Sequence, residues 1–169
     1  MADYGPAGRQ QGAAYAGNRQ QAATPKVTVA IPVYNGANYI AEAIESVLCQ
    51  TFEDLELVIT DNASTDETGD ICRRFALLDS RVRYFRNPTN LGAAPNYNRG
   101  LELARGEYFK WLAHDDWISP NYLELCVPLL DRNPQFVVAH GSSAEMVDRT
   151  TPFLDSTFTV PLWGTAGPV

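Results

Sequence analysis

The sequence has little positive charge. Its 13 lysine and arginine residues are outnumbered by 20 aspartate and glutamate residues, so the formal net charge is −7 at pH 7. Nucleic acids and anionic membranes attract surfaces that are rich in lysine and arginine. The composition therefore argues against a broad surface that binds nucleic acid or an anionic membrane, and we expect no nucleic-acid partner. It allows a small basic pocket.

Cysteines are also scarce. The 169 residues include three of them, without CxxC or Cys/His metal spacing: Cys49, Cys72 and Cys126. This pattern indicates reduced, buried thiols in a cytoplasmic protein, and argues against a disulfide framework or a zinc site.

Long apolar runs are absent. None reaches the roughly 20 residues that a transmembrane helix needs, and residues 1–25, which are rich in Ala, Gly and Gln, contain no apolar core of a signal peptide. We predict a disordered tail over 1–25 and no transmembrane segment. The sequence leaves the formation of a homo-oligomer open.

From residue 26 onward, strand and helix patterns alternate. Apolar runs, mostly rich in β-branched residues, predict strands at 27–33, 55–60, 82–87, 108–113 and 136–141. Apolar residues at helical spacing predict helices at 38–50, 64–78 and 95–104 and after 119. Such alternation with short connections is typical of βαβ units and a mostly parallel sheet. We expect one α/β domain over 26–145, followed by an irregular segment over 146–169.

Two of these helices begin with capping signals. Ser64 and Glu67 have the spacing of a capping box, in which each side chain accepts a hydrogen bond from a free backbone N–H of the first turn. Ser119 and Pro120 predict an N-cap and a first helical residue. Pro128 is expected to kink this last helix or end it early.

Polar residues follow four of the predicted strands. These segments are Tyr34-Asn35, Asp61-Asn62, Asn87 to Gly92, and His114-Asp115-Asp116. In open α/β sheets, ligands bind beyond the carboxyl ends of the strands. Each segment alone could be a solvated turn, but four such segments meeting at one edge favour a ligand site.

The first two segments suit a nucleoside. The Tyr34 ring could stack on a base, since every base has a π-face, or it could cover the edge of the sheet. The Asp61 carboxylate could accept a hydrogen bond from a base N–H or a ribose hydroxyl, or it could cap the following helix. The residues alone do not decide between these alternatives.

The loop Asn90-Leu91-Gly92 is small and permissive. Gly92 allows a ligand to approach the backbone, and the following helix start favours negative charge. The sequence contains no GxGxxG or Walker A pattern, so a dinucleotide or P-loop site is not supported.

Asp115 and Asp116 carry the sharpest signal. Carboxylate oxygens suit Mg²⁺ and Mn²⁺, which are commonly held by one or two carboxylates together with substrate phosphates. The alternative is that the pair caps the helix after Ser119, a role that Ser119 and Pro120 already fill. His114 is not expected to be a ligand, because neighbouring residues of a strand face opposite ways.

Taken together, residues 27–142 resemble the family 2 glycosyltransferases of GT-A fold. The matching stretches are VTVAIPVYNGANYIAEAIESVLCQTF, LELVITDNASTDETGDI, NLGAAPNYNRGLELARGEY and FKWLAHDDWISPNYLE. The resemblance implies a Rossmann-like, mostly parallel sheet flanked by helices. It also implies transfer of a sugar from a nucleotide-diphosphate donor to a hydroxyl acceptor, with inversion and with the help of Mn²⁺ or Mg²⁺.

The resemblance places eight residues on a UDP-, dTDP- or GDP-linked sugar. They are Pro32, Tyr34 and Asn35 along the nucleoside, Asp61 at the base or ribose, Asn90 and Gly92 near the donor, and Asp115 and Asp116 at the metal. Of the acidic pair, Asp116 is the expected direct ligand, and Asp115 is expected near the ribose or sugar.

The sequence departs from the family in several places. Ala113 replaces an acidic residue, Asn96-Tyr97-Asn98 lacks a common arginine, and Ala63 stands where the family commonly has glycine. No downstream acid has the context of a general base, which is therefore expected beyond residue 169, together with the C-terminal acceptor-binding part. The alternatives are a non-catalytic nucleotide-sugar-binding module, or a truncated fragment that needs a partner or the missing half.

Overall fold

The computed structural model describes residues 24–141. Strands and helices alternate through this part: β1 (Val27–Val33), α1 (Ile40–Leu48), β2 (Leu55–Asp61), α2 (Thr68–Leu78), β3 (Val82–Arg86), α3 (Ala93–Leu103), β4 (Tyr108–Trp111) and α4 (Tyr122–Arg132). The strands pair in parallel in the order β3-β2-β1-β4. The predicted α/β class with a mostly parallel sheet is confirmed. Apart from residues 24 and 25, the predicted tails over 1–25 and 146–169 lie outside the described residues.

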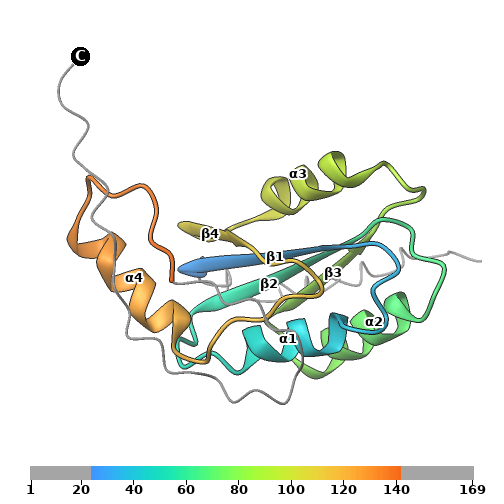
Figure 1. Cartoon of the computed structure of the whole chain (residues 1–169), viewed down its shortest axis with the longest axis horizontal. Helices are drawn as coiled ribbons and strands as arrows, with labels where there is room; N and C mark the ends of the chain where they lie inside the picture. The colour runs from blue at the N-terminus through green and yellow to red at the C-terminus, as the bar shows by residue number, and fades with distance from the viewer. Residues whose placement is uncertain (1–23, 142–169) are drawn as a thin grey trace, which may run out of the picture.

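Helices cover both faces of the sheet (Figure 1). Alternate residues of β1, from Val27 to Val33, belong to the apolar core shared with α1. The intervening Ala30 faces α3, where a Cβ placed on Gly100 would lie only 3.0 Å from the Ala30 Cβ. Small residues at this crossing therefore let α3 pack close to the sheet.

The shortest strand sets the position of the predicted acidic segment. β4 pairs with only the first four residues of β1, from Val27 to Ala30, and the Leu112 N–H donates to the Ala30 carbonyl at 2.9 Å. Because β1 continues to Val33, the chain after β4 runs beside the carboxyl end of β1.

The predicted strand at 136–141 is wrong, because this segment has no strand structure. Val137 and Val138 are 92% and 68% exposed. A run of apolar residues becomes a strand only where a neighbouring strand pairs with it, and none does so within residues 24–141.

The two helix starts that were predicted from capping signals are also wrong. α2 begins at Thr68, and its N-cap Glu67 makes no side-chain capping bond. α4 begins at Tyr122, after Ser119 and Pro120, which lie in the preceding loop. Pro128 lies inside α4 and does not end it.

Among the described residues, no helix combines the length and apolar character that crossing a membrane requires.

Candidate functional site

The carboxyl ends of the three strands β1, β2 and β3 lie side by side, as predicted. The backbone ladder continues past the strands, since the Asn62 N–H donates to the Val33 carbonyl and the Asn87 N–H to the Asp61 carbonyl, both at 2.8 Å. This extension brings the residues that follow each strand into neighbouring positions.

The loop after β1 is tied to the loop after β2 through Asn35. The Asn35 N–H donates to Ser64 Oγ at 2.9 Å, and the Thr65 N–H donates to Asn35 Oδ1 at 2.8 Å. Asn35 has a φ of 53°, a left-handed conformation that asparagine tolerates better than most residues. The Asn35 side chain, predicted to lie along a nucleoside, therefore shapes the loop that carries Tyr34.

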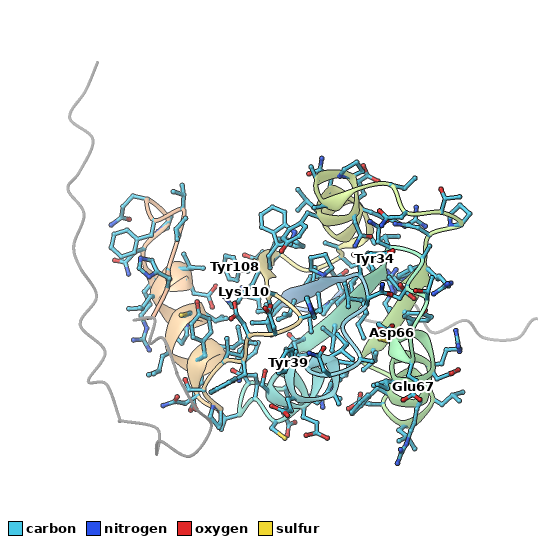
Figure 2. All side chains as sticks on the ribbon, turned by 45° about the vertical axis from the view of Figure 1, so that its right-hand side comes forward. Tyr34, Tyr39, Asp66, Glu67, Tyr108 and Lys110 are labelled. Carbon is cyan, nitrogen blue, oxygen red and sulfur yellow. The ribbon has the colours of Figure 1, made fainter. Side chains whose placement is uncertain are left out.

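A second pair of bonds joins the same two loops. The Gly36 N–H donates to Thr68 Oγ1 at 2.9 Å, and the Ala37 N–H donates to Asp66 Oδ2 at 3.1 Å. Burial opposes ionisation of Asp66, but the hydrogen bonds from Thr68 and Ala37 outweigh it and lower the pKa of that carboxyl. Figure 2 shows Tyr34 and Asp66 toward the same end of the sheet.

Tyr34 and Pro32 are positioned differently with respect to solvent. Pro32 is buried within β1, whereas the Tyr34 side chain is 46% exposed. The Tyr34 ring thus presents a face to solvent while the following residues are held by hydrogen bonds. This geometry is compatible with stacking on a base.

Asp61 lies at the end of β2 and is fully buried. One carboxylate oxygen accepts the Ser64 N–H at 2.8 Å. The other accepts the Tyr84 hydroxyl and the Arg86 Nη1–H, both at 2.6 Å. Arg86 also donates to the Ser64 carbonyl at 2.7 Å.

These bonds control the ionisation of the pair Asp61 and Tyr84. Burial disfavours the charged Asp61, but the hydrogen bonds from Ser64, Tyr84 and Arg86 outweigh it and lower the pKa of the carboxyl. Burial, together with the hydrogen bond to Asp61, raises the pKa of Tyr84 to about 12. Asp61 is therefore a charged group that organises the ends of β2 and β3.

Asparagine side chains hold the loop after β3. Buried Asn87 donates from Nδ2 to Asn62 Oδ1 at 3.0 Å and to Asn96 Oδ1 at 2.9 Å. Asn90 Oδ1 accepts from Asn62 Nδ2 and from the Gly92 N–H, both at 2.8 Å. Gly92 has a φ of 87°, so a glycine is required here for backbone shape. The Asn90 oxygen, predicted near the donor, is engaged within the loop.

Asp115 and Asp116 lie in an exposed turn after β4. The Asp116 N–H donates to the Ala113 carbonyl at 3.2 Å, and the Asp115 side chain is 57% exposed. Because α4 begins only at Tyr122, the pair is too far from that helix to cap it. Ser119 does not cap the helix, contrary to the sequence prediction. The aspartates do not cap it either, because the helix begins later than predicted.

His114 also lies in this turn, not in a strand. The sequence argument that its side chain faces away from Asp115 therefore does not apply. A Cβ placed on Gly36 would lie 2.4 Å from His114 Cδ2. The ring of His114 thus packs against the loop after β1 and joins the acidic turn to the rest of the edge.

The acidic turn could supply two carboxylate ligands to a hard divalent cation. Among residues 24–141, no group of three His, Cys, Asp or Glu side chains comes together as a metal site. Two exposed carboxylates fit an ion that takes its other ligands from phosphate oxygens and water, which is the usual arrangement for Mg²⁺.

Several residues that organise the edge were missed from the sequence. They are Asp66, Thr68 and Tyr84, and the bond between Arg86 and Asp61 was missed as well. The S-T-D pattern before α2 was visible, but it also fits helix capping, and nothing local connects Tyr84 or Arg86 to Asp61.

Comparison with known proteins shows the family of this chain. The sequence profile described as glycosyl transferase family 2 matches residues 28–163. The chain belongs to glycosyl transferase family 2. The resemblance drawn from the sequence motifs is therefore confirmed.

Two relatives show the range of similarity. An uncharacterised glycosyltransferase of Rickettsia typhi is 36% identical over 133 residues, which are 78% of this chain and 40% of the relative. The glycosyltransferase GlyA of Streptococcus pneumoniae is 37% identical over 99 residues, 59% of this chain and 14% of the relative. The matched part of this chain thus covers less than half the length of either relative.

Two solved glycosyltransferase structures have a similar fold. The crystal structure of S. aureus TarS in complex with UDP-GlcNAc matches with a TM-score of 0.61 and 28% identity, over 64% of this chain and 32% of that chain. The mannosyltransferase PcManGT from Pyrobaculum calidifontis, in complex with GDP-Man and Mn²⁺, matches with a TM-score of 0.51 and 32% identity, over 55% of this chain and 28% of that chain. The fold is that of the GT-A glycosyltransferases.

Proposed function

We propose that this chain is the donor-binding part of an inverting glycosyltransferase that uses Mn²⁺ or Mg²⁺. The observation that carries the proposal is the exposed Asp115–Asp116 turn beside the exposed Tyr34 loop. The complexes of TarS with UDP-GlcNAc and of PcManGT with GDP-Man and Mn²⁺ support a nucleotide-sugar ligand.

In this proposal, the loop that carries Tyr34 and the acidic turn bind different parts of the donor. Tyr34 stacks on the base, while Pro32 and Asn35 shape the nucleoside side of the pocket. Asp61 is buried, so it acts mainly by holding Arg86, whose side chain is 41% exposed and can donate toward the base or ribose. The backbone of the Asn90–Gly92 loop borders the donor.

The acidic turn supplies the diphosphate end. Asp116 would be a direct ligand of the divalent cation, and Asp115 would lie at the metal or near the ribose or sugar. A bound cation would neutralise the negative charge that builds on the departing diphosphate. In this proposal, the general base that deprotonates the acceptor hydroxyl lies outside this chain. We also propose that the protein is cytoplasmic.

Calorimetric titration of the chain with UDP, dTDP and GDP, with and without Mn²⁺, tests the site. We expect Mn²⁺ to strengthen binding of one of these nucleotides. Replacing Asp115 and Asp116 together by Asn should weaken that Mn²⁺-dependent binding more than tenfold. Loss of a residue that hydrogen-bonds to a metal ligand lowers metal affinity about 10–100-fold, and loss of a direct ligand should cost at least as much.

The chain offers a matched control for this double variant. Glu53 and Asp54 form another adjacent exposed acidic pair, just before β2 and therefore at the opposite edge of the sheet. Glu53→Gln with Asp54→Asn makes the same change in charge and should leave binding unchanged. Equal affinities of all three proteins would refute the metal assignment. Binding without sugar transfer, even after the chain is extended to the length of its relatives, would indicate a non-catalytic module.

A further inference from the structure

The ring of His114 fills the space beside Gly36. A Cβ placed on Gly36 would lie 2.4 Å from His114 Cδ2, 3.1 Å from His114 Cγ and 2.7 Å from Val33 Cγ2. Real Cβ atoms do not approach other heavy atoms this closely. Glycine is therefore needed here because two neighbouring side chains occupy the place of its missing side chain.

The opposite side of Gly36 is fixed by hydrogen bonds. Its N–H donates to Thr68 Oγ1 at 2.9 Å, and its carbonyl accepts the Ile40 N–H at 2.9 Å. Gly36 is thus anchored to the start of α2 and to the first turn of α1. A ring that packs on Gly36 rests on a rigid support.

The acidic turn has few other attachments. Before it, the Leu112 N–H donates to the Ala30 carbonyl at 2.9 Å. After it, the Ile118 N–H reaches Ser46 Oγ at 3.4 Å. Between these points, the packing of His114 on Gly36 ties the turn to the loop after β1.

We propose that His114 is a positioning residue for the acidic turn. By resting on Gly36, its ring sets the position of Asp115 and Asp116 relative to Tyr34, so that one nucleoside diphosphate can reach both ends of the edge. This inference rests on the proposed function, but the contact itself can be tested without any ligand.

The contact depends on the shape of the ring and not on its nitrogens. The atoms of the His114 ring nearest to a Cβ placed on Gly36 are Cδ2 and Cγ. Nδ1 lies 3.9 Å from Asp115 Oδ1, which is too long for a hydrogen bond. A phenylalanine at this position should therefore keep the contact, whereas an alanine should lose it.

Thermal unfolding of ligand-free variants tests the contact. Gly36→Ala should lower the unfolding midpoint by about 5 °C or more, as expected for overpacking of a tight site. Adding His114→Ala should recover part of this loss, since it removes the nearest atom, Cδ2, while Val33 Cγ2 at 2.7 Å limits the recovery. Strictly additive midpoint shifts would overturn the contact.

Gly106 provides the matched control. A Cβ placed on Gly106 would lie 2.4 Å from the Thr28 backbone nitrogen, so Gly106→Ala creates a clash at the same distance, here with backbone atoms, at the other end of β1. Adding His114→Ala to this variant should recover nothing. Recovery of equal size in both backgrounds would mean that His114→Ala stabilises the chain generally, which would also overturn the inference.

Calorimetry tests the positioning role itself. For Mn²⁺-dependent binding of UDP, or of whichever nucleotide the wild type prefers, His114→Ala should weaken affinity about tenfold, in the range found for outer partners of metal ligands. His114→Phe should stay within about twofold of wild type, and metal-free binding should not change in either variant. Loss in both variants would identify His114 as a ligand and overturn the positioning role. Absence of nucleotide binding by the wild type would defeat the proposed function, whereas the unfolding experiment would still decide the contact.

Discussion

Asp61 ends β2 and the pair Asp115–Asp116 follows β4, two strands that lie on either side of β1, yet the surroundings of these carboxylates differ. Asp61 is fully buried and accepts hydrogen bonds from Ser64, Tyr84 and Arg86. Asp115 and Asp116 are exposed in a turn that has few attachments. Aspartates that look alike in the sequence therefore serve different purposes. Asp61 organises the protein, whereas Asp115 and Asp116 present their oxygens to solvent.

The difference follows from how each carboxylate is solvated. A buried charge must be compensated by the protein, since it has lost its water. Asp61 receives this compensation from three donors and is thereby committed to the fold. Exposed carboxylates keep their water and can exchange it for a cation at a smaller cost.

The largest expected effect comes from removing the buried carboxylate. Asp61→Ala leaves the Tyr84 hydroxyl, the Arg86 guanidinium and the Ser64 N–H without their acceptor, and should lower the free energy of unfolding by about 3 kcal/mol. Urea unfolding followed by circular dichroism measures this change. Asp115→Ala with Asp116→Ala should change it by less than about 0.5 kcal/mol, as is usual for surface substitutions. Similar losses in the two proteins would remove the distinction between the sites.

Protonation of the buried carboxylate should contribute to acid unfolding. The pKa of Asp61 is lowered in the folded chain from its ordinary value of 3.8, so the folded state resists protonation more than the unfolded state does. Its contribution to stability is complete above that ordinary value and is lost as the pH falls through the folded pKa. Unfolding measured between neutral pH and pH 2 should show a shallower acid dependence in Asp61→Asn than in the wild type. Unchanged acid dependence would show that the carboxylate is not stabilised in the folded state.

The smallest expected effect concerns the loop that Asp61 organises. Ala63 has a φ of 63°, a left-handed conformation that costs an L-residue roughly 1–2 kcal/mol. Ala63→Gly relieves this strain but increases the entropy of the unfolded chain, at a cost of roughly 0.5–1 kcal/mol. We expect a net stabilisation of about 0.5 kcal/mol, measured as a small rise in the unfolding midpoint. The exposed turn offers a comparison, since Ala113→Gly relieves no positive φ and should not stabilise the chain.

Sequence patterns predicted the architecture because they report local periodicity. The apolar runs at 27–33 and 55–60 became the two central strands, and the alternation with helices fixed a parallel sheet. The run at 136–141 failed because strand formation depends on a pairing partner, and the sequence of one segment does not specify that partner.

Capping patterns were less reliable than periodicity. Ser64 has the spacing of an N-cap, but its hydroxyl accepts the Asn35 N–H from a different loop. A short polar side chain can satisfy any nearby backbone donor. Which donor lies nearby is decided by the packing of β1 beside β2.

The sequence by itself determined where the four strands lie along the chain, and therefore which polar segments gather beyond their carboxyl ends. It also determined the family, through motifs in a characteristic order. Only the tertiary structure decided that Asp61 is buried, that Asp115 and Asp116 are exposed, and that His114 rests on Gly36. The physical reason is that burial and side-chain contacts depend on partners far away in the sequence: Tyr84, Arg86 and Gly36 are placed by the pairing and packing of the sheet, and no local pattern encodes them.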